Sequence, residues 1–138
     1  MNATTSNATE SSKRQVIAIQ IDQGLTSLRG LSPQRLRFEL EYALERGSTA
    51  NSFLFEGGLD ATGTYQPAVL VHPPGMAYSS AFLPALAETL KTEDQSLLVV
   101  VGHVNPNRVA LLHELAIIYS GLELIASNPG FKLLNELW

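Results

Sequence analysis

Four polar residues at the end of an apolar run could do metal or anion chemistry. The run Val99–Val101 ends at Gly102, and the residues that follow it are His103, Asn105, Asn107 and Arg108. Metal ligation needs a neutral imidazole or an anionic oxygen, so His103 alone qualifies. The Asn side chains offer only a neutral carbonyl oxygen, and the Arg108 guanidinium is a fixed cation that repels a metal ion. These residue types predict a site that binds no metal by itself.

Other readings of the same segment assign it different roles. Asn105 precedes Pro106, which is the pattern of an N-cap followed by Pro at the first helical position. His103 is then a loop histidine hydrogen-bonded to backbone. In another reading, the Arg108 guanidinium fills the space of absent metal ions and supplies their charge. The helix N-terminus and Arg108 could also attract an anion.

The other histidines give weaker signals. His72 follows the apolar run Ala68–Val71 and could line the same end of the sheet as His103, although such pairs are more often structural than metal-binding. His113 lies in a helical stretch and is predicted to be a surface residue. No catalytic residue is predicted, because the sequence lacks a Gly-x-Ser-x-Gly elbow, a phosphate-binding glycine loop and a dinucleotide fingerprint.

Composition excludes several classes of protein. The formal net charge is −4 and no basic block is present, which argues against nucleic acid as a partner. The absence of Cys excludes disulfides and thiolate metal sites, and it fits a cytoplasmic protein. No apolar run is long enough to span a membrane.

Two regions differ in composition. Residues 1–14 are almost entirely small, polar or charged, and we expect a disordered N-terminal tail because so little apolar surface cannot offset the entropy of ordering. Residues 15–138 are of ordinary size for one domain. Because the final apolar pattern stops at Trp138 without a capping residue, we expect this domain to be truncated.

The element order predicts an α/β (α+β) fold with a mixed sheet and helices on one face. Alternating or branched runs predict strands at Val16–Ile21, Leu25–Leu28, Asn51–Glu56, Ala68–His72, Leu97–Val101 and Leu122–Ala126. Period-two alternation favours strand over helix within 35–45. Longer amphipathic patterns predict helices at Ala77–Leu90, Pro106–Tyr119 and from Asn128 to Trp138. Ser32-Pro33 predicts a helical turn with Ser32 as its N-cap.

Several of these segments together resemble the flavodiiron proteins, over about residues 14 to 138. The segments are Leu25-Thr26-Ser27-Leu28-Arg29, Arg37-Phe38-Glu39-Leu40-Glu41-Tyr42, Gly47-Ser48-Thr49-Ala50-Asn51-Ser52-Phe53-Leu54 and Gly102-His103-Val104-Asn105-Pro106-Asn107-Arg108. Within the family, the chain looks most like the cyanobacterial and chloroplast members that carry an extra flavin reductase domain. Val71-His72-Pro73-Pro74-Gly75 adds a likeness to the paralogue whose diiron ligands are replaced by neutral and basic residues.

The resemblance implies a metallo-β-lactamase-like αββα sandwich, of which residues 15–138 would supply the N-terminal half. Members of that fold place a His-x-Glu-x-Asp-His metal cluster where this sequence has His103, Asn105, Asn107 and Arg108. The resemblance therefore implies a degenerate diiron site. Half a sandwich would also expose its inner sheet face, so we expect the 138-residue chain to dimerise or to be held by other chains.

The resemblance also implies a function for a longer protein. Flavodiiron proteins reduce oxygen to water with electrons from NAD(P)H or ferredoxin and protect photosynthetic electron transport. FMN, and FAD with NAD(P)H where a reductase domain is present, would bind outside this chain, which would itself hold no cofactor. The partners would be flavodiiron subunits in a homo- or hetero-oligomer. Two alternatives are a metallo-β-lactamase-like hydrolase that uses other ligands and a non-catalytic α/β interaction module.

Overall fold

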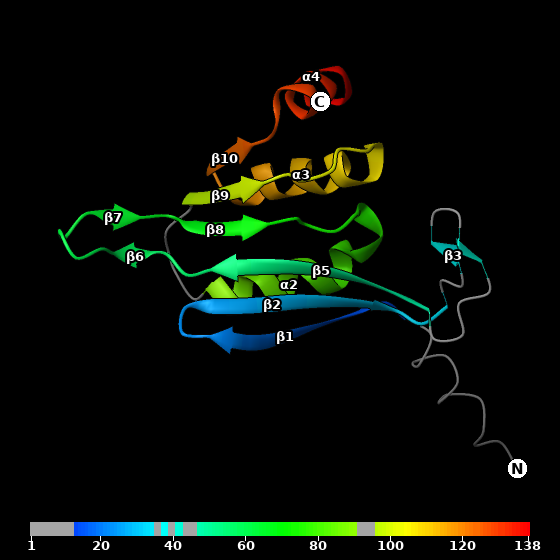
Figure 1. Cartoon of the computed structure of the whole chain (residues 1–138), viewed down its shortest axis with the longest axis horizontal. Helices are drawn as coiled ribbons and strands as arrows, with labels where there is room; N and C mark the ends of the chain where they lie inside the picture. Colours follow the sequence, from blue (N-terminus) through cyan, green and yellow to red (C-terminus); the bar gives the residue numbers. More distant parts are fainter. Residues whose placement is uncertain (1–12, 35–36, 39–40, 43–46, 91–95) are drawn as a thin grey trace, which may run out of the picture.

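The computed structural model describes residues 13–34, 37–38, 41–42, 47–90 and 96–138 and is built on a six-stranded mixed sheet (Figure 1). Its strand order is β1-β2-β5-β8-β9-β10. The strands are β1 (Gln15–Asp22), β2 (Leu25–Ser32), β5 (Ser48–Phe55), β8 (Ala68–Val71), β9 (Ser96–Val100) and β10 (Gly121–Ile125). The predicted strands are thus confirmed, with shifts of up to a few residues at their ends.

The direction of each strand follows from the length of its connection. β1 and β2 form an antiparallel hairpin across Gln23-Gly24, and Gly24 supplies the positive φ of +71° that this turn needs. β2, β5 and β8 continue the antiparallel pairing. β8, β9 and β10 run parallel, because a helix bridges each successive pair of these strands.

Two short hairpins stand apart from this sheet. β3 (Arg37–Phe38) pairs with β4 (Glu41–Tyr42), and β6 (Gly58–Leu59) pairs with β7 (Tyr65–Gln66). The β6–β7 hairpin projects beyond the sheet in Figure 1. Hydrogen bonds from the Thr62 hydroxyl, the Gln66 amide and the Thr62 and Thr64 backbone hold the Asp60 carboxylate and lower its pKa to about 2.

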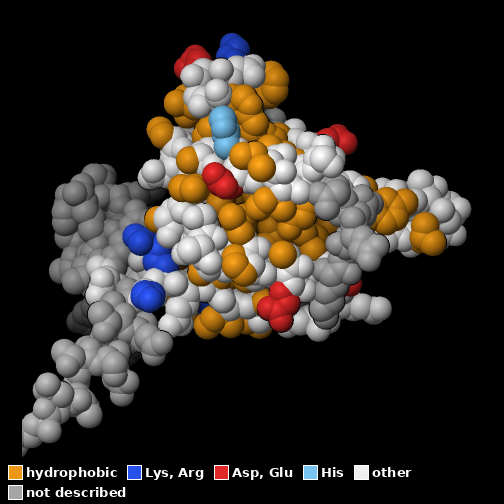
Figure 2. All heavy atoms as spheres, turned by 180° about the vertical axis from the view of Figure 1, so that it is seen from behind, with side chains coloured by type: hydrophobic (Ala, Val, Ile, Leu, Met, Phe, Trp, Pro, Cys, Tyr) orange, Lys and Arg blue, Asp and Glu red, His pale blue; other side chains and the backbone are white. Residues whose placement is uncertain are grey.

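The helices lie on one side of the sheet and enclose the core with it. They are the 3-10 helix η1 (Met76–Tyr78), α2 (Ser79–Leu90), α3 (Pro106–Ile118) and α4 (Asn128–Leu137). In Figure 1 α2 and α3 lie behind the strands, and Figure 2 shows the molecule from that side. The core side chains, each at most 1% exposed, are Leu28, Leu54, Leu70, Phe82, Leu86, Leu97, Val99, Leu111, Leu112 and Leu115.

The other face of the sheet carries apolar side chains that remain exposed. Because strand side chains alternate, the neighbours of the buried Leu54 point away from the helices. Phe53 and Phe55 are accordingly 37% and 45% exposed, and Ile17 and Ile19 on β1 are each 44% exposed. The sheet is therefore covered on one face only within the part of the chain that the structure describes.

The N-cap predicted at Ser32 is wrong, because tertiary pairing extends β2 through this residue. Ser32 pairs with Ser48 of β5, and Pro33 begins a turn rather than a helix. The Ser32 carbonyl oxygen lies so close to Gly47 that a Cβ there would clash with it, and Gly47 has a φ of +76°. The strand ladder and this glycine turn outweigh the local Ser-Pro signal.

The mixed α/β sheet with helices on one face confirms the predicted fold class. Two predictions concern residues that lie largely outside the described ones. The predicted N-terminal tail covers 1–14, of which 1–12 are not described. The predicted strand region covers 35–45, of which 35–36, 39–40 and 43–45 are not described. Arg14 is described, and its guanidinium carbon lies 5.7 Å from the centre of the Tyr78 ring. None of the described helices is both long and apolar enough to span a membrane.

Truncation of Phe82 tests the role of α2 in this core. Phe82 is fully buried, so Phe82→Ala should lower the free energy of unfolding by about 3–5 kcal/mol through lost burial and a cavity. Ile117 on α3 is 79% exposed, and Ile117→Ala should change it by less than about 0.5 kcal/mol. Urea unfolding followed by circular dichroism measures both values. Equal effects would contradict the packing described above.

Candidate functional site

The candidate residues meet where two parallel strands end and a helix begins. β8 ends at Val71 and is followed by His72, while β9 ends at Val100 and leads to His103 and then to α3. The carboxyl ends of neighbouring parallel strands meet at one sheet edge, where open α/β sheets commonly place their binding sites. The structure thus brings His72, His103 and Arg108 together at this edge of the sheet.

Arg108 points inward and joins the two loops at this edge. Its Nε donates a 2.6 Å hydrogen bond to the Pro73 carbonyl oxygen, and its Nη1 donates a 2.6 Å bond to the His103 carbonyl oxygen. Its Nη2 lies 3.4 Å from His72 Nε2. Arg108 is half-buried, and the N–H groups of its guanidinium donate to protein acceptors and not to water alone.

The backbone of His72 is held in a conformation that a non-glycine residue seldom adopts. Its φ is +59°, in the left-handed region. The His72 N–H donates to the Val100 carbonyl oxygen at 2.9 Å, and the fully buried Ser52 hydroxyl donates to the His72 carbonyl oxygen at 2.8 Å. These two bonds hold the backbone N–H and the backbone carbonyl of His72. Strands β5 and β9 therefore hold the His72 backbone in this conformation, with its ring beside Arg108.

Gly102 makes room for the His72 ring. A Cβ at Gly102 would lie 3.2 Å from His72 Nδ1, which is closer than most such contacts. The sequence alone did not single out Gly102, Ser52 or the Pro73 carbonyl. A glycine directly after a buried strand was the available signal for Gly102, whereas nothing local marks Ser52 as a partner of a residue twenty positions away.

Asn105 acts as the N-cap of α3. Its Oδ1 accepts a 2.8 Å hydrogen bond from the Arg108 N–H, and Pro106 occupies the first helical position. The capping geometry read from the sequence is therefore present. Asn107 lies in the first turn of α3 and is exposed, with its Cβ near Gly75. The Asn105 amide oxygen is therefore used by the helix cap.

Electrostatics at this edge disfavour additional positive charge. Burial, followed by the charges of Arg108 and His103, lowers the pKa of His72 below its ordinary value of 6.5. Burial also lowers the pKa of Arg108, although a guanidinium stays charged at any physiological pH. A neutral His72 can accept from Arg108, whereas a protonated one would add a second cation beside it.

The donor set here does not fit a diiron centre. Iron in a carboxylate and imidazole site needs several anionic or imidazole ligands. Here the Arg108 guanidinium, a fixed cation, is bonded to the His103 carbonyl oxygen and lies beside the His72 ring. Asn105 Oδ1 is already engaged as a cap. Among the described residues, no three His, Asp or Glu side chains come together in a group that could hold a metal ion.

His113 differs from the expectation of a surface residue. It is partly buried, and its ring centre lies 4.2 Å from that of Trp138, with the planes tilted by 45°. Its Nε2 is buried without a hydrogen-bond partner in the described part of the chain. The sequence reading failed because it could not place Trp138, twenty-five residues later, against this face of α3.

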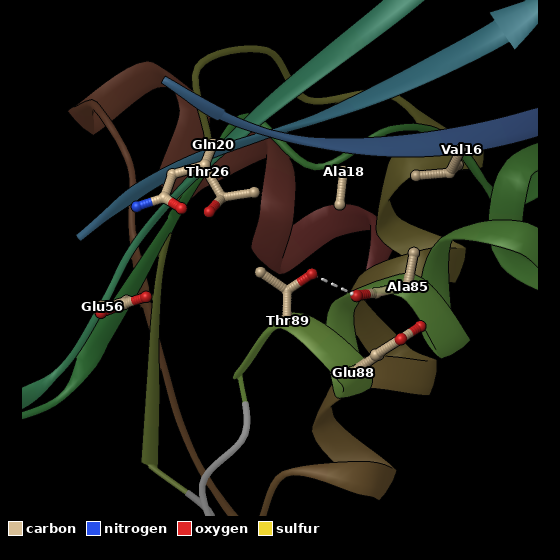
Figure 3. Close-up of a pocket in the computed structure, with 8 residues that line it drawn as sticks. All are labelled: Val16, Ala18, Gln20, Thr26, Glu56, Ala85, Glu88 and Thr89. Atoms are coloured by element: carbon tan, nitrogen blue, oxygen red, sulfur yellow. Dashed lines mark hydrogen bonds between the residues drawn. The ribbon is translucent and has the colours of Figure 1, made fainter. Parts of the chain in front are cut away.

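A separate cavity of about 340 Å³ lies between β1 and α2 (Figure 3). Its polar lining includes Gln20, Thr26, Glu56, Glu88 and Thr89. Figure 3 shows Glu56 and Glu88 at opposite sides of it, and the Thr89 hydroxyl donates to the Ala85 carbonyl at 2.7 Å. The two carboxylates do not converge as an acid–base pair would.

The chain is similar in sequence to diflavin flavoproteins of cyanobacteria. No family model matches the chain. Diflavin flavoprotein A 6 of Nostoc sp. is 39% identical over 117 residues, which is 85% of this chain and 19% of that protein. Diflavin flavoprotein A 4 of Nostoc sp. is 35% identical over 128 residues, or 93% and 21%. The chain thus spans about one fifth of the length of the curated relatives it matches.

The chain is also similar to solved structures of flavodiiron proteins. The metal-soaked flavodiiron core of a Synechocystis protein superposes with a TM-score of 0.76 at 32% identity, over 91% of this chain and 29% of that one. A fragment (residues 1–254) of diflavin flavoprotein A 5 of Nostoc sp. gives 0.75 at 31% identity, over 90% and 46%. A flavoprotein from Thermotoga maritima, 20% identical with a TM-score of 0.73, shares the fold. The expected half of a metallo-β-lactamase-like sandwich is confirmed.

Loss of the N-cap should destabilise the chain measurably. Asn105→Ala removes the acceptor for the Arg108 N–H and should lower the free energy of unfolding by about 1 kcal/mol. Asn105→Ser keeps a capping oxygen and should recover most of the loss. Chemical denaturation of the three proteins checks this order. Equal destabilisation by Ala and Ser would show that the cap is not the cause.

Acidification should weaken the fold through His72. Because its pKa is lower in the folded than in the unfolded chain, the unfolded state binds more protons as the pH falls below 6.5. The stability associated with neutral His72 is therefore present above this pH and is lost below it. His72→Asn, which tolerates positive φ, should flatten this part of the profile. Urea midpoints between pH 5 and 8 test it, and parallel profiles would contradict it.

Proposed function

This chain belongs to the flavodiiron family, and on that premise we propose that it is the N-terminal half of the metallo-β-lactamase-like domain of an oxidoreductase subunit whose own diiron site is degenerate. Its 35–39% identity to two diflavin flavoproteins supports the family role. The site residues support the degeneracy, because the segment after β9 carries neutral and basic side chains. In this proposal His103, Asn105, Asn107 and Arg108 mark the degenerate positions, and His72 lines the site.

The observation that carries the proposal is the inward position of Arg108. Its two 2.6 Å hydrogen bonds to backbone carbonyls and its approach to His72 place a permanent positive charge between the two histidine-bearing loops. A metal ion there would face repulsion by this charge and a shortage of anionic ligands. In this proposal the Arg108 guanidinium supplies the positive charge of the missing metal ions. Its bonds to Pro73 and His103 hold the two loops in the positions that metal ligation would otherwise give them.

The proposed activity belongs to a longer, cytoplasmic protein of which this chain is a part. That protein would reduce oxygen to water with electrons derived from NAD(P)H or ferredoxin, in support of photosynthetic electron transport. Its FMN, together with FAD and NAD(P)H if it has a reductase domain, would bind outside residues 15–138. Because the site in this chain is degenerate, oxygen reduction would occur at an intact site of a partner flavodiiron subunit in a homo- or hetero-oligomer.

The main rival function is a metal-dependent hydrolase. The charge of His103 contributes to the lowered pKa of His72, so the two residues are close enough to interact. This favours the hydrolase, since two imidazoles can share a metal ion. It requires Arg108 to leave its carbonyl partners when metal binds. The two functions therefore differ in one measurable property, the affinity of this chain for a transition metal.

Metal affinity tests the proposal with a restored ligand set. We expect the natural chain to retain no stoichiometric zinc or iron after loading and desalting, by elemental analysis. The triple variant Asn105→Glu, Asn107→Asp, Arg108→His supplies the missing donors and should bind zinc at least about tenfold more tightly in calorimetry. Circular dichroism confirms that it folds.

A matched control separates the site from a general effect of added histidine. Arg29 is an exposed arginine on β2, which lies two strands from β8 and three from β9 in the strand order. Arg29→His should leave metal affinity unchanged. Stoichiometric metal in the natural chain would contradict the degenerate site and support the hydrolase.

A further inference from the structure

Strand β1 forms one edge of the sheet, and little in its sequence protects that edge. It stands at the end of the strand order, and among the described strands it pairs with β2 alone. The outer side of such a strand presents N–H and C=O groups that can pair with another chain. Natural edge strands commonly carry Lys or Pro that prevents this pairing, yet the stretch from Gln15 to Ile21 contains no charged residue and no Pro. The edge of β1 is therefore open to an added strand.

The cavity between β1 and α2 lies beside this edge (Figure 3). Its wall on the β1 side is made by Val16, Ala18 and Gln20, of which Ala18 and Gln20 are exposed. These side chains lie on the helix side of the sheet, because Ala18 pairs with Leu28, which is buried in the core that the helices cover. The helix side is the outer side of an αββα sandwich. A second sheet packed on the other face would therefore leave this cavity accessible.

The lining of the cavity favours a long cationic side chain. Its charged groups are two carboxylates, Glu56 and Glu88, which lie at opposite sides in Figure 3. Thr26 is only 8% exposed, and its hydroxyl points into the cavity without a hydrogen-bond partner among the described residues. A buried hydroxyl without a partner is costly, and the N–H donors of a bound cation would satisfy it. Ala18 and Ala85 add an apolar wall that suits the methylene stem of Lys or Arg.

We propose that this edge binds an extended segment of another protein, which adds as a strand beside β1 and places one Lys or Arg side chain in the cavity. Side chains of the added strand alternate between the two faces, so every second residue points toward the side of α2. The residue opposite Ala18 lies beside the smallest side chain of the β1 wall, and its stem can pass beneath Ala18 toward Glu88. The recognised pattern is thus a basic residue with smaller residues two positions before and after it.

The dimensions of the edge fit this mode of recognition. The pairing of β1 with β2 is regular from Gln15 to Gln20 and shifts only beyond Gln20. Six residues of strand extend about 20 Å, so a segment of six residues matches the regular part. Backbone hydrogen bonds to an edge strand supply affinity with little sequence preference, and side-chain cavities beside the strand supply specificity. In this site the two carboxylates supply the preference for a basic residue.

Peptide binding to the protein at its natural length tests the proposal. The probe is a fluorescein-labelled hexapeptide, Thr-Val-Lys-Val-Thr-Val, and its binding is followed by fluorescence anisotropy. We expect a dissociation constant of about 1–100 μM, in the range of a short peptide with one specific side chain. A peptide with Glu in place of Lys should bind at least about tenfold more weakly, because its carboxylate would face Glu56 and Glu88. Methylation of all the peptide's backbone nitrogens should abolish binding, because β1 then loses its strand partner's donors.

A double variant separates the cavity from the overall charge of the protein. Glu56→Gln with Glu88→Gln removes both charges and keeps the side-chain shapes, so it should raise the dissociation constant of the Lys peptide at least about fivefold. The matched control is Glu123→Gln with Glu136→Gln, which makes the same charge change at two exposed residues on β10 and α4. This control should leave the dissociation constant unchanged. Circular dichroism checks that both variants fold as the natural protein does.

Several results would overturn the proposal. These are absence of binding to the natural protein, equal binding of the Lys and Glu peptides, equal effects of the two double variants, and undiminished binding of the methylated peptide. Self-association of the protein that the Lys peptide does not reverse would assign the edge to a second copy instead. Arg108 lies at the ends of β8 and β9, three and four strands from β1 in the strand order, so each of these results leaves the proposed function to its own test.

Discussion

A guanidinium bonded to two backbone carbonyls organises the edge of the sheet where β8 and β9 end. Arg108 reaches the carbonyls of Pro73 and His103 from the first turn of α3, so one side chain ties together two loops and a helix. Pro73 is buried, and a buried carbonyl left without a partner costs about 1–3 kcal/mol, so the bond from Arg108 Nε to the Pro73 carbonyl stabilises this edge. His72, Gly102 and Asn105 complete the arrangement around it. A fixed cation can thus maintain a metal-site-like shape that, in our proposal, no metal supports.

The two faces of the sheet obey different constraints. On the helix side, Leu54, Leu70 and Val99 are fully buried, and the packing of α2 and α3 fixes the register of the central strands. On the other side, the same alternation leaves Phe53 and Phe55 exposed. A register slip of one residue would exchange these sets, so burial of one face also determines what the other presents. The alternation of side chains along the strands therefore determines both the buried core and the set of apolar side chains on the exposed face.

Local patterns predicted most of the fold, and contacts between distant residues account for the failures. The period of the apolar residues located the strands and helices, and Asn105-Pro106 identified the start of α3 correctly. The N-cap predicted at Ser32 was wrong because β5 pairs with this residue, and the surface position predicted for His113 was wrong because Trp138 packs on its ring. The residues of the candidate site were chosen by residue type alone. The geometry of the site, including the positive φ of His72 and the Ser52 bond, depends on strands that only the folded sheet brings together.

The central claim is that Arg108 occupies the position that a metal would otherwise take. A crystal structure of the chain grown with excess zinc, with anomalous data collected at the zinc edge, addresses it directly. Our account predicts no anomalous peak within bonding distance of His72 or His103, and Arg108 Nε still bonded to the Pro73 carbonyl. A strong peak between the two histidines, with the Arg108 side chain displaced toward solvent, would contradict it.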